Sequence, residues 1–233
     1  MLVGESVTDK ERNRKLYLWV RNTPKLIPMQ ILSVNVGLPK EYEWQGRTVR
    51  TAILKHPTPG PVRLAPAFVE GDEQANKRVH GGPNKAVYSY DAQFYTFWQE
   101  AGKTLEMGAF GENLTTEGLP DSEAGLGDTF RMGTAVLMVV QPRFPCNNLN
   151  VRFNDATMVK QFQQARRHGI YYKVLEAGQV GPGDRIERIE TAPYGVTIQD
   201  VVDQFYEKSP DPAFIEKLFR FPNLTNYLKE HFS

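Results

Sequence analysis

The sequence is poor in cysteine: among 233 residues, only Cys146 carries a thiol. A single cysteine excludes a disulfide framework within the chain, and chains without disulfides are typical of a reducing compartment. We therefore expect a cytoplasmic protein whose stability depends on a packed core. The length suits one large domain, or one domain with a small appendage, and is sufficient to bury such a core.

Long apolar runs and an excess of either charge are also missing. No run approaches the roughly 18 residues that cross a bilayer. The longest apolar piece near the N-terminus, residues 16–20, is too short for the core of a signal peptide. Lys and Arg total 28 against 27 Asp and Glu. This balance indicates neither a membrane surface nor nucleic acid as a partner.

Histidine is scarce, which limits the kinds of metal or nucleophilic site. The four histidines, His56, His80, His168 and His231, include no pair at helical i, i+4 spacing, so a local zinc motif is not indicated. No nucleophile elbow marks a serine triad. A cysteine–histidine protease would need Cys146 beside His80 in space, and no local signature points to that arrangement.

The apolar pattern predicts strands for most of the chain up to about residue 190. Alternating or continuous apolar segments predict strands at 30–36, 47–54, 61–64, 86–90, 134–140, 170–175 and 185–189. Two helices interrupt them: one begins after Asp91 and stops at Gly102, and one runs from Asp155 or Thr157 to His168.

After about residue 196 the pattern becomes helical. Thr197 and Asp200 resemble a capping box, Asp211 precedes a proline suited to the first helical position, and a third helix is expected after Pro222. Strands followed by segregated helices favour an α+β fold. The three helices carry mixed charges, so we expect a compact appendage and not a DNA reader.

These patterns divide the chain into three parts. Residues 1–28 are polar and basic, which predicts a loosely ordered extension. Residues 29–190 form the expected main domain, because Met29 opens the first strand pattern. Residues 191–233 form the expected three-helix subdomain.

The lone cysteine lies in a polar, stiff stretch at residues 141–150. The strand at 134–140 leads directly into it, and Pro142 and Pro145 restrict the backbone on either side of Arg143. Arg143 is suited to stabilise a thiolate, the form of cysteine that acts as nucleophile or metal ligand. The alternative is that Cys146 only fills space in the core, as free cysteines often do.

Two other stretches carry polar groups on glycine-rich backbone. In residues 80–85, Gly81 and Gly82 allow backbone amides to approach an anion, and His80 and Lys85 add donors. The alternative is a simple turn. Residues 108–116 combine glycines with a carboxylate, an amide and two hydroxyls, which by themselves are a weak signal for a polar-ligand loop. Neither stretch contains a Walker A or dinucleotide fingerprint.

Taken in order, three stretches resemble one family. His-Gly-Gly-Pro-Asn-Lys at 80–85, Gly-Ala-Phe-Gly-Glu-Asn-Leu at 108–114 and Gln-Pro-Arg-Phe-Pro-Cys at 141–146 are similar to the signatures of MOSC-domain proteins, in particular the bacterial YiiM-like branch. The family is named after the molybdenum cofactor sulfurase C-terminal domain. The resemblance covers about residue 29 to the end. It implies a β-barrel-like main domain with flanking helices and a three-helix appendage.

The resemblance also implies a molybdenum–molybdopterin cofactor (Moco), with Cys146 as the metal ligand. It implies reduction of N-hydroxylated compounds, such as hydroxylamino purine analogues, with electrons from a separate reductase. Glu112 is then a candidate proton relay. The candidates for binding the pyranopterin and its phosphate are His80, Gly81, Gly82, Lys85, Gly111, Asn113, Arg143 and Asn148. The alternative function is a sulfur-carrier or cofactor-binding module, in which Cys146 holds a persulfide without turnover.

Overall fold

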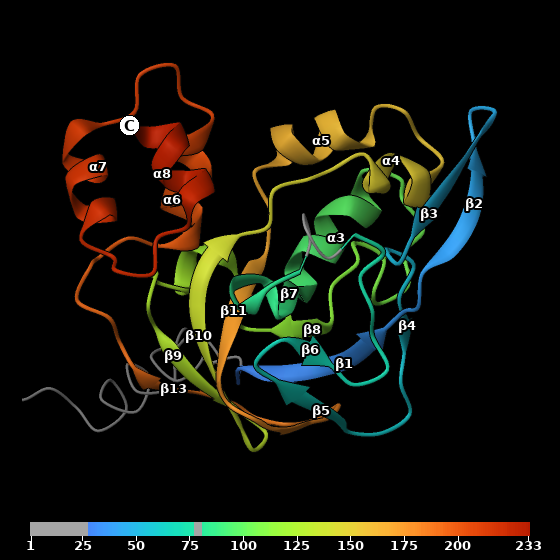
Figure 1. Ribbon diagram of the computed structural model, residues 1–233, viewed down its shortest axis with the longest axis horizontal. Coiled ribbons are helices and arrows are strands. Elements are labelled where there is room, and N and C mark those ends of the chain that lie inside the picture. The colour runs from blue at the N-terminus through green and yellow to red at the C-terminus, as the bar shows by residue number, and fades with distance from the viewer. Residues whose placement is uncertain (1–27, 77–80) are drawn as a thin grey trace, which may run out of the picture.

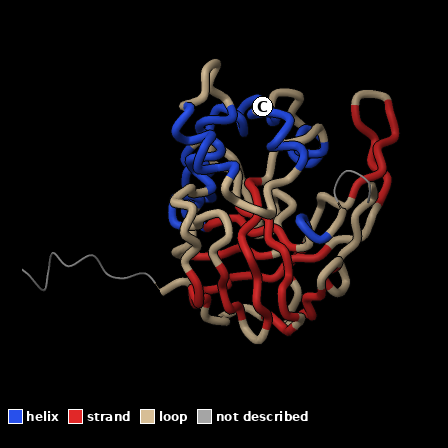
Figure 2. The backbone as a smooth tube through the Cα atoms, turned by 60° about the vertical axis from the view of Figure 1, so that its left-hand side comes forward, coloured by secondary structure: helices blue, strands red, loops and turns tan. Residues whose placement is uncertain are grey.

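The protein is described by a computed structural model that covers residues 28–76 and 81–233. Strands form the lower part of the molecule and most helices lie above them (Figure 2). The chain therefore has the expected α+β fold. The predicted N-terminal extension lies, except for its last residue, outside the described residues. In the described part, no helix is both long enough and apolar enough to cross a membrane.

The main element is a mixed sheet of eight strands (Figure 1). Their order across the sheet is β13 (Ile186–Glu190), β9 (Thr129–Met132), β10 (Ala135–Pro142), β11 (Ile170–Glu176), β7 (Val87–Asp91), β8 (Leu114–Glu117), β1 (Gln30–Val36) and β4 (His56–Pro57). Neighbouring strands pair antiparallel except β7 and β8, which run parallel and are joined through the helix α3 (Ala92–Glu100).

The sheet does not close into a barrel, so the expected barrel-like domain is wrong in this respect. β13 and β4 stand at its two edges. An isolated bridge joins Gln30 to Arg185, and the amide of Ile31 donates to the carbonyl of Asp184 at 2.9 Å. Further along its length, β1 pairs with β4 at Asn35 and Val36. The result is a curled, open sheet.

Two smaller sheets accompany the main one. β5 (Val62–Ala65) pairs with β6 (Phe68–Val69) and β12 (Gly178–Val180). β2 (Lys40–Trp44) and β3 (Arg47–Thr51) form a hairpin that projects from the body of the protein (Figure 1). The strand predicted at 47–54 ends at Thr51, and residues 52–55 continue as an irregular segment. That segment becomes important in the site.

The helices begin where the capping residues predict. The side chain of Asp91 accepts from the amide of Gln93 at 3.0 Å and starts α3. The second predicted helix is α5 (Met158–Ala165), which is shorter than expected. A helix that was not predicted, α4 (Asn148–Phe153), lies directly after Cys146. Two short 3-10 turns complete this part: η1 (Pro83–Lys85) and η2 (Asp121–Glu123).

Three helices follow the last strand, as predicted. They are α6 (Ile198–Phe205), α7 (Pro212–Phe219) and α8 (Asn226–Phe232), and they gather in one group (Figure 1). Thr197 and Asp200 form the predicted capping box, and Asp211 caps α7 through the amide of Ala213 at 2.9 Å. The boundary drawn between residues 190 and 191 stays a prediction.

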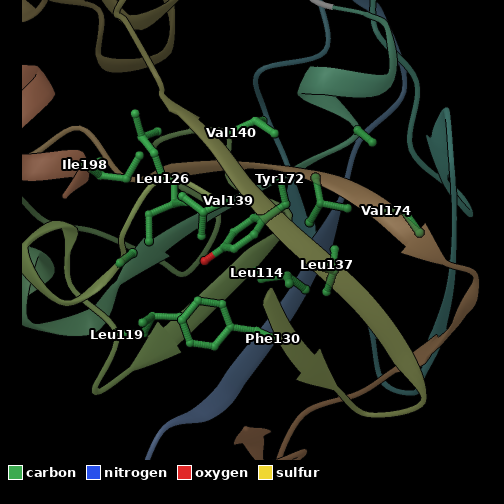
Figure 3. Packing of buried hydrophobic residues seen from close by; sticks show 14 of the residues in the cluster. Leu114, Leu119, Leu126, Phe130, Leu137, Val139, Val140, Tyr172, Val174 and Ile198 are labelled. Carbon is green, nitrogen blue, oxygen red and sulfur yellow. The ribbon is translucent and has the colours of Figure 1, made fainter. Parts of the chain in front are cut away.

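The core has two parts. The larger cluster surrounds β10 and β11, where Phe130, Leu137 and Tyr172 pack between the strands (Figure 3). The second is aromatic and includes Trp98 of α3 and Phe162 of α5. This confirms that the aromatic positions of the first predicted helix belong to the core. The aromatic cluster also lies under the site.

Candidate functional site

A cavity of about 270 Å³ contains most of the predicted site residues. One side is formed by residues 50–55, which are the end of β3 and the segment after it, and by the loop at 72–76; Leu54 does not line the cavity. Of the predicted site residues, those that line the cavity are Lys85, Gly111, Asn113, Arg143, Cys146 and Asn148. Three stretches far apart in the sequence therefore meet at one place.

Cys146 stands at the junction between the end of β10 and the start of α4. β10 ends at Pro142, and the carbonyl of Cys146 accepts from the amide of Leu149 at 3.0 Å. Its side chain is half-buried and lines the cavity. A cysteine that only filled space would lie in an apolar core, so this position favours a functional thiol.

Arg143 is the most unusual charged group of the cavity. Only 5% of its surface is exposed, and its guanidinium carbon lies 5.6 Å from the ring centre of Tyr88 and 5.5 Å from that of Phe162. Among the described residues, none accepts a hydrogen bond from its Nη1 atom. A buried donor without an acceptor costs free energy unless a ligand supplies one.

Lys85 faces the same cavity from η1. Burial lowers the pKa of Lys85, while the nearby Cys146 raises it. The side chain of Gln141, in β10, donates from Nε2 to the carbonyl of Asn84 at 3.3 Å. The strand that leads to the cysteine therefore also holds the turn that carries Lys85.

The glycines before Lys85 do not line the cavity. Gly82 is exposed, with a φ of 101°, and Gly81 is half-buried. Their predicted role as an anion-binding nest stays a prediction, with no support from their position. His80 lies outside the described residues.

Glu112 also does not line the cavity. Its side chain is fully buried and accepts from the amides of Gly108 at 2.9 Å and Phe110 at 3.1 Å. The hydroxyls of Tyr95 and Thr115 also donate to it. Burial raises the pKa of this carboxyl. The geometry favours a structural role, in which Glu112 shapes the loop at 108–112, over the predicted proton relay.

The neighbours of Glu112 have different roles. Gly111 lines the cavity with a φ of +79°, and a Cβ there would lie 2.9 Å from Cγ1 of Ile53. Glycine is required by both the backbone conformation and the contact. Asn113 accepts at Oδ1 from the amide of Tyr88 at 3.2 Å and donates from Nδ2 to Asp72 at 3.1 Å. Its amide is thus already engaged with protein groups on both ends.

Sequence reasoning missed charged residues of the cavity, among them Lys55 and Asp72. Their side chains form an ion pair and are only 8% and 2% exposed. Both line the cavity. The sequence offered one signal for Lys55, which is a lysine directly after the apolar residues 52–54. It offered none for Asp72, because residues 71–76 have only the composition of a polar loop.

Comparison with known proteins identifies the family. The profile of the MOSC domain matches residues 76–187. The protein YflK of Bacillus subtilis is 39% identical over 189 residues, which cover 81% of this chain and 86% of the relative. A protein of Gibberella moniliformis named "Reductase" is 35% identical over 173 residues, which cover 72% of this chain but 30% of that protein.

Solved structures give the same result. The crystal structure of YiiM from Geobacillus stearothermophilus superposes with a TM-score of 0.74 at 31% identity, covering 88% of this chain and 97% of that one. The order of the three motifs, the shared cavity and these similarities lead to one conclusion. The chain belongs to the MOSC-domain family and is similar to its YiiM and YflK proteins.

Proposed function

We propose that this protein is an oxidoreductase that binds a molybdenum–molybdopterin cofactor and reduces N-hydroxylated compounds to amines. Hydroxylamino purine analogues are examples of such substrates. The observation that carries the proposal is that a cysteine thiol and a buried guanidinium without a full set of acceptors line one cavity. The fungal relative named "Reductase" supports the class of reaction.

The residues of the cavity fit the chemistry of this cofactor. A thiolate is a suitable ligand for a soft metal that already has sulfur ligands, and Cys146 offers it. Arg143 and Lys85 offer donors to a phosphate or another anionic group. The Nη1 atom of Arg143 lacks an acceptor among the described residues, which an anionic ligand would provide. Asn148 adds an amide that lines the same space.

The protein side of the reaction consists of binding, orientation and proton supply. When bound, the cofactor supplies the redox chemistry. Reduction of an N–OH group consumes two electrons and two protons and releases an amine and water. A cluster of iron and sulfur needs several cysteines, and this chain has one. We therefore propose that a separate reductase supplies the electrons.

The test is to purify the protein from a host that makes the cofactor. Wild type, Cys146→Ala and Cys146→Ser are compared for bound molybdenum, pterin content, turnover of 6-hydroxylaminopurine and melting temperature. We expect both variants to lose molybdenum and turnover while they remain folded. The serine variant should not restore molybdenum binding or turnover, because its hydroxyl is mostly protonated at neutral pH and is a harder ligand than a thiolate.

Arg143→Ala should be milder and should weaken cofactor retention or activity through lost charge stabilisation. A Cys146→Ala protein that keeps both its metal and its turnover would contradict the assignment of the cysteine. Wild-type protein without molybdenum or pterin, but with labile sulfane sulfur on Cys146, would indicate a sulfur carrier instead.

A further inference from the structure

The cavity has a second charged wall, which the proposed function leaves without a role. Lys55 and Asp72 line it, on segments that carry none of the family motifs described above. Both belong to the side of the cavity formed by residues 50–55 and 72–76, and Cys146, Arg143 and Asn148 belong to the stretch at 141–150. A ligand in the cavity therefore lies within a space that both groups of residues share.

The surrounding structure holds this lysine in place. The carbonyl oxygen of Lys55 lies so close to Gly108 that a Cβ added to this glycine would be 2.9 Å from it. The backbone of Lys55 therefore packs against the loop at 108–112. Its partner Asp72 accepts from the amide of Gly37 at 2.8 Å and from Nδ2 of Asn113 at 3.1 Å. The carboxylate is thus fixed by two donors besides Lys55. This arrangement orients the ammonium group.

The hydrogen bonding of Lys55 is incomplete. An ammonium group has three donors, and among the residues that the structure describes Asp72 is its only hydrogen-bond partner. Burial lowers the pKa of Lys55, while Asp72 and Glu112 raise it. Lys55 lines the cavity, and a buried cation with unused donors is costly unless a ligand uses them. Perturbed groups in a cleft are typical of functional sites.

We propose that Lys55 binds the oxygen of the substrate's N–OH group and protonates it as the N–O bond breaks. The inference rests on the proposed function. The cofactor, which Cys146, Arg143 and Lys85 would hold, would supply the two electrons that cleave the N–O bond. The oxygen takes one proton from the Lys55 ammonium and leaves as water, the nitrogen takes a second proton from solvent, and solvent reprotonates Lys55. Asp72 is the positioning residue.

The first experiment separates charge from proton transfer. Lys55→Met removes the ammonium, and Lys55→Arg keeps a positive charge that does not release its proton at neutral pH. We expect kcat with 6-hydroxylaminopurine to fall ~100-fold or more in both variants, the range for loss of a general acid. Bound molybdenum and pterin should stay at the wild-type level. A Lys55→Met or Lys55→Arg protein with wild-type kcat would overturn the proton-donor role.

The second experiment does not depend on turnover. Calorimetry measures the binding of 6-hydroxylaminopurine and of adenine, which lacks the oxygen, to cofactor-loaded wild type and Lys55→Met without reductase. We expect the variant to lose roughly tenfold in affinity for the hydroxylated base only, since a hydrogen bond from a charged donor is lost. Equal losses for both bases, or no loss, would overturn the assignment. A wild-type protein that binds 6-hydroxylaminopurine but does not reduce it would refute the proposed function. The comparison of affinities would still decide whether Lys55 binds the oxygen of the N–OH group.

Two further variants protect the test against misfolding. Lys55→Met leaves the buried carboxylate of Asp72 without its cation, which destabilises proteins, so the double variant Lys55→Met/Asp72→Asn removes both charges. It should bind and turn over like Lys55→Met, and wild-type behaviour in it would overturn the proposal. The matched control is Lys103→Met, which removes another lysine–aspartate pair, Lys103 to Asp155 at 3.0 Å, outside the cavity.

Discussion

A buried histidine beside the cysteine loop should make the stability of this protein depend on pH. The side chain of His168 is fully buried, and among the described residues its Nδ1 atom has no partner. Its ring centre lies 5.6 Å from that of Phe144, two residues before the cysteine, and 5.2 Å from that of Phe162. Burial and the nearby Arg143 lower the pKa of His168 from 6.5 to about 3.

The sign and size of the effect follow from linkage. Below pH 6.5 the unfolded chain takes up a proton at this histidine, whereas the folded protein does so only near pH 3. Stability is therefore lost as the pH falls through this window. Each pH unit within this window corresponds to about 1.4 kcal/mol of unfolding free energy. Between pH 7 and pH 5 the loss due to His168 should amount to about 2 kcal/mol.

A carboxyl nearby acts in the opposite direction. Asp121 accepts from the backbone amide of His168 at 2.8 Å, and burial raises its pKa from 3.8 to about 7. The folded protein therefore takes up a proton at Asp121 before the unfolded chain does. The stability that it contributes is present below pH 3.8 and is lost as the pH rises through 7. Wild type alone shows only the sum of both groups, so a variant is needed.

Urea denaturation of wild type and His168→Gln at pH 7 and pH 5 isolates the histidine. The packing lost in the variant lowers the free energy of unfolding by the same amount at both pH values. The titration of His168 changes it by different amounts at the two pH values. We expect the variant to gain about 2 kcal/mol relative to wild type on going from pH 7 to pH 5. His56→Gln, which removes an exposed imidazole, is the matched control and should leave the wild-type pH response in place. A stability difference between wild type and His168→Gln that is the same at both pH values would refute the reasoning.

Three other predictions concern the supports of the site. Gly111→Ala should lower the free energy of unfolding by about 1–3 kcal/mol in urea titrations, because its φ is +79° and a Cβ would contact Ile53 at 2.9 Å; an unchanged midpoint would contradict the required glycine. Phe144→Ala should cost about 2 kcal/mol and speed amide exchange in α8, since its ring lies 4.1 Å from Phe205 and 5.3 Å from Tyr227; unchanged exchange would show that the cysteine loop and the C-terminal helices are independent. Thr197→Ala should cost about 1 kcal/mol through the lost cap, measured as a lower melting temperature, and no shift would mean that the capping box contributes nothing.

The sequence by itself determined the features that depend on neighbours along the chain. Asp91, Thr197 and Asp211 start helices because their side chains satisfy amides two or three residues later. β1 has the bounds that its apolar pattern predicted, Gln30–Val36. The strand before Cys146 was also predictable, since a buried run after a turn has few other interpretations. The family followed from three short motifs, each readable without the fold.

Only the tertiary structure decided which polar groups face the cavity. Glu112 and Asn113 are adjacent in one motif, yet Glu112 is turned into the protein, where four donors satisfy it, and Asn113 lines the cavity. Lys55 and Asp72 became site residues because folding brings together segments 17 residues apart. The open sheet is also a tertiary feature, since its two edge strands, β4 and β13, are far apart in the sequence. Such choices depend on the sum of long-range contacts, and local patterns contain no information about them.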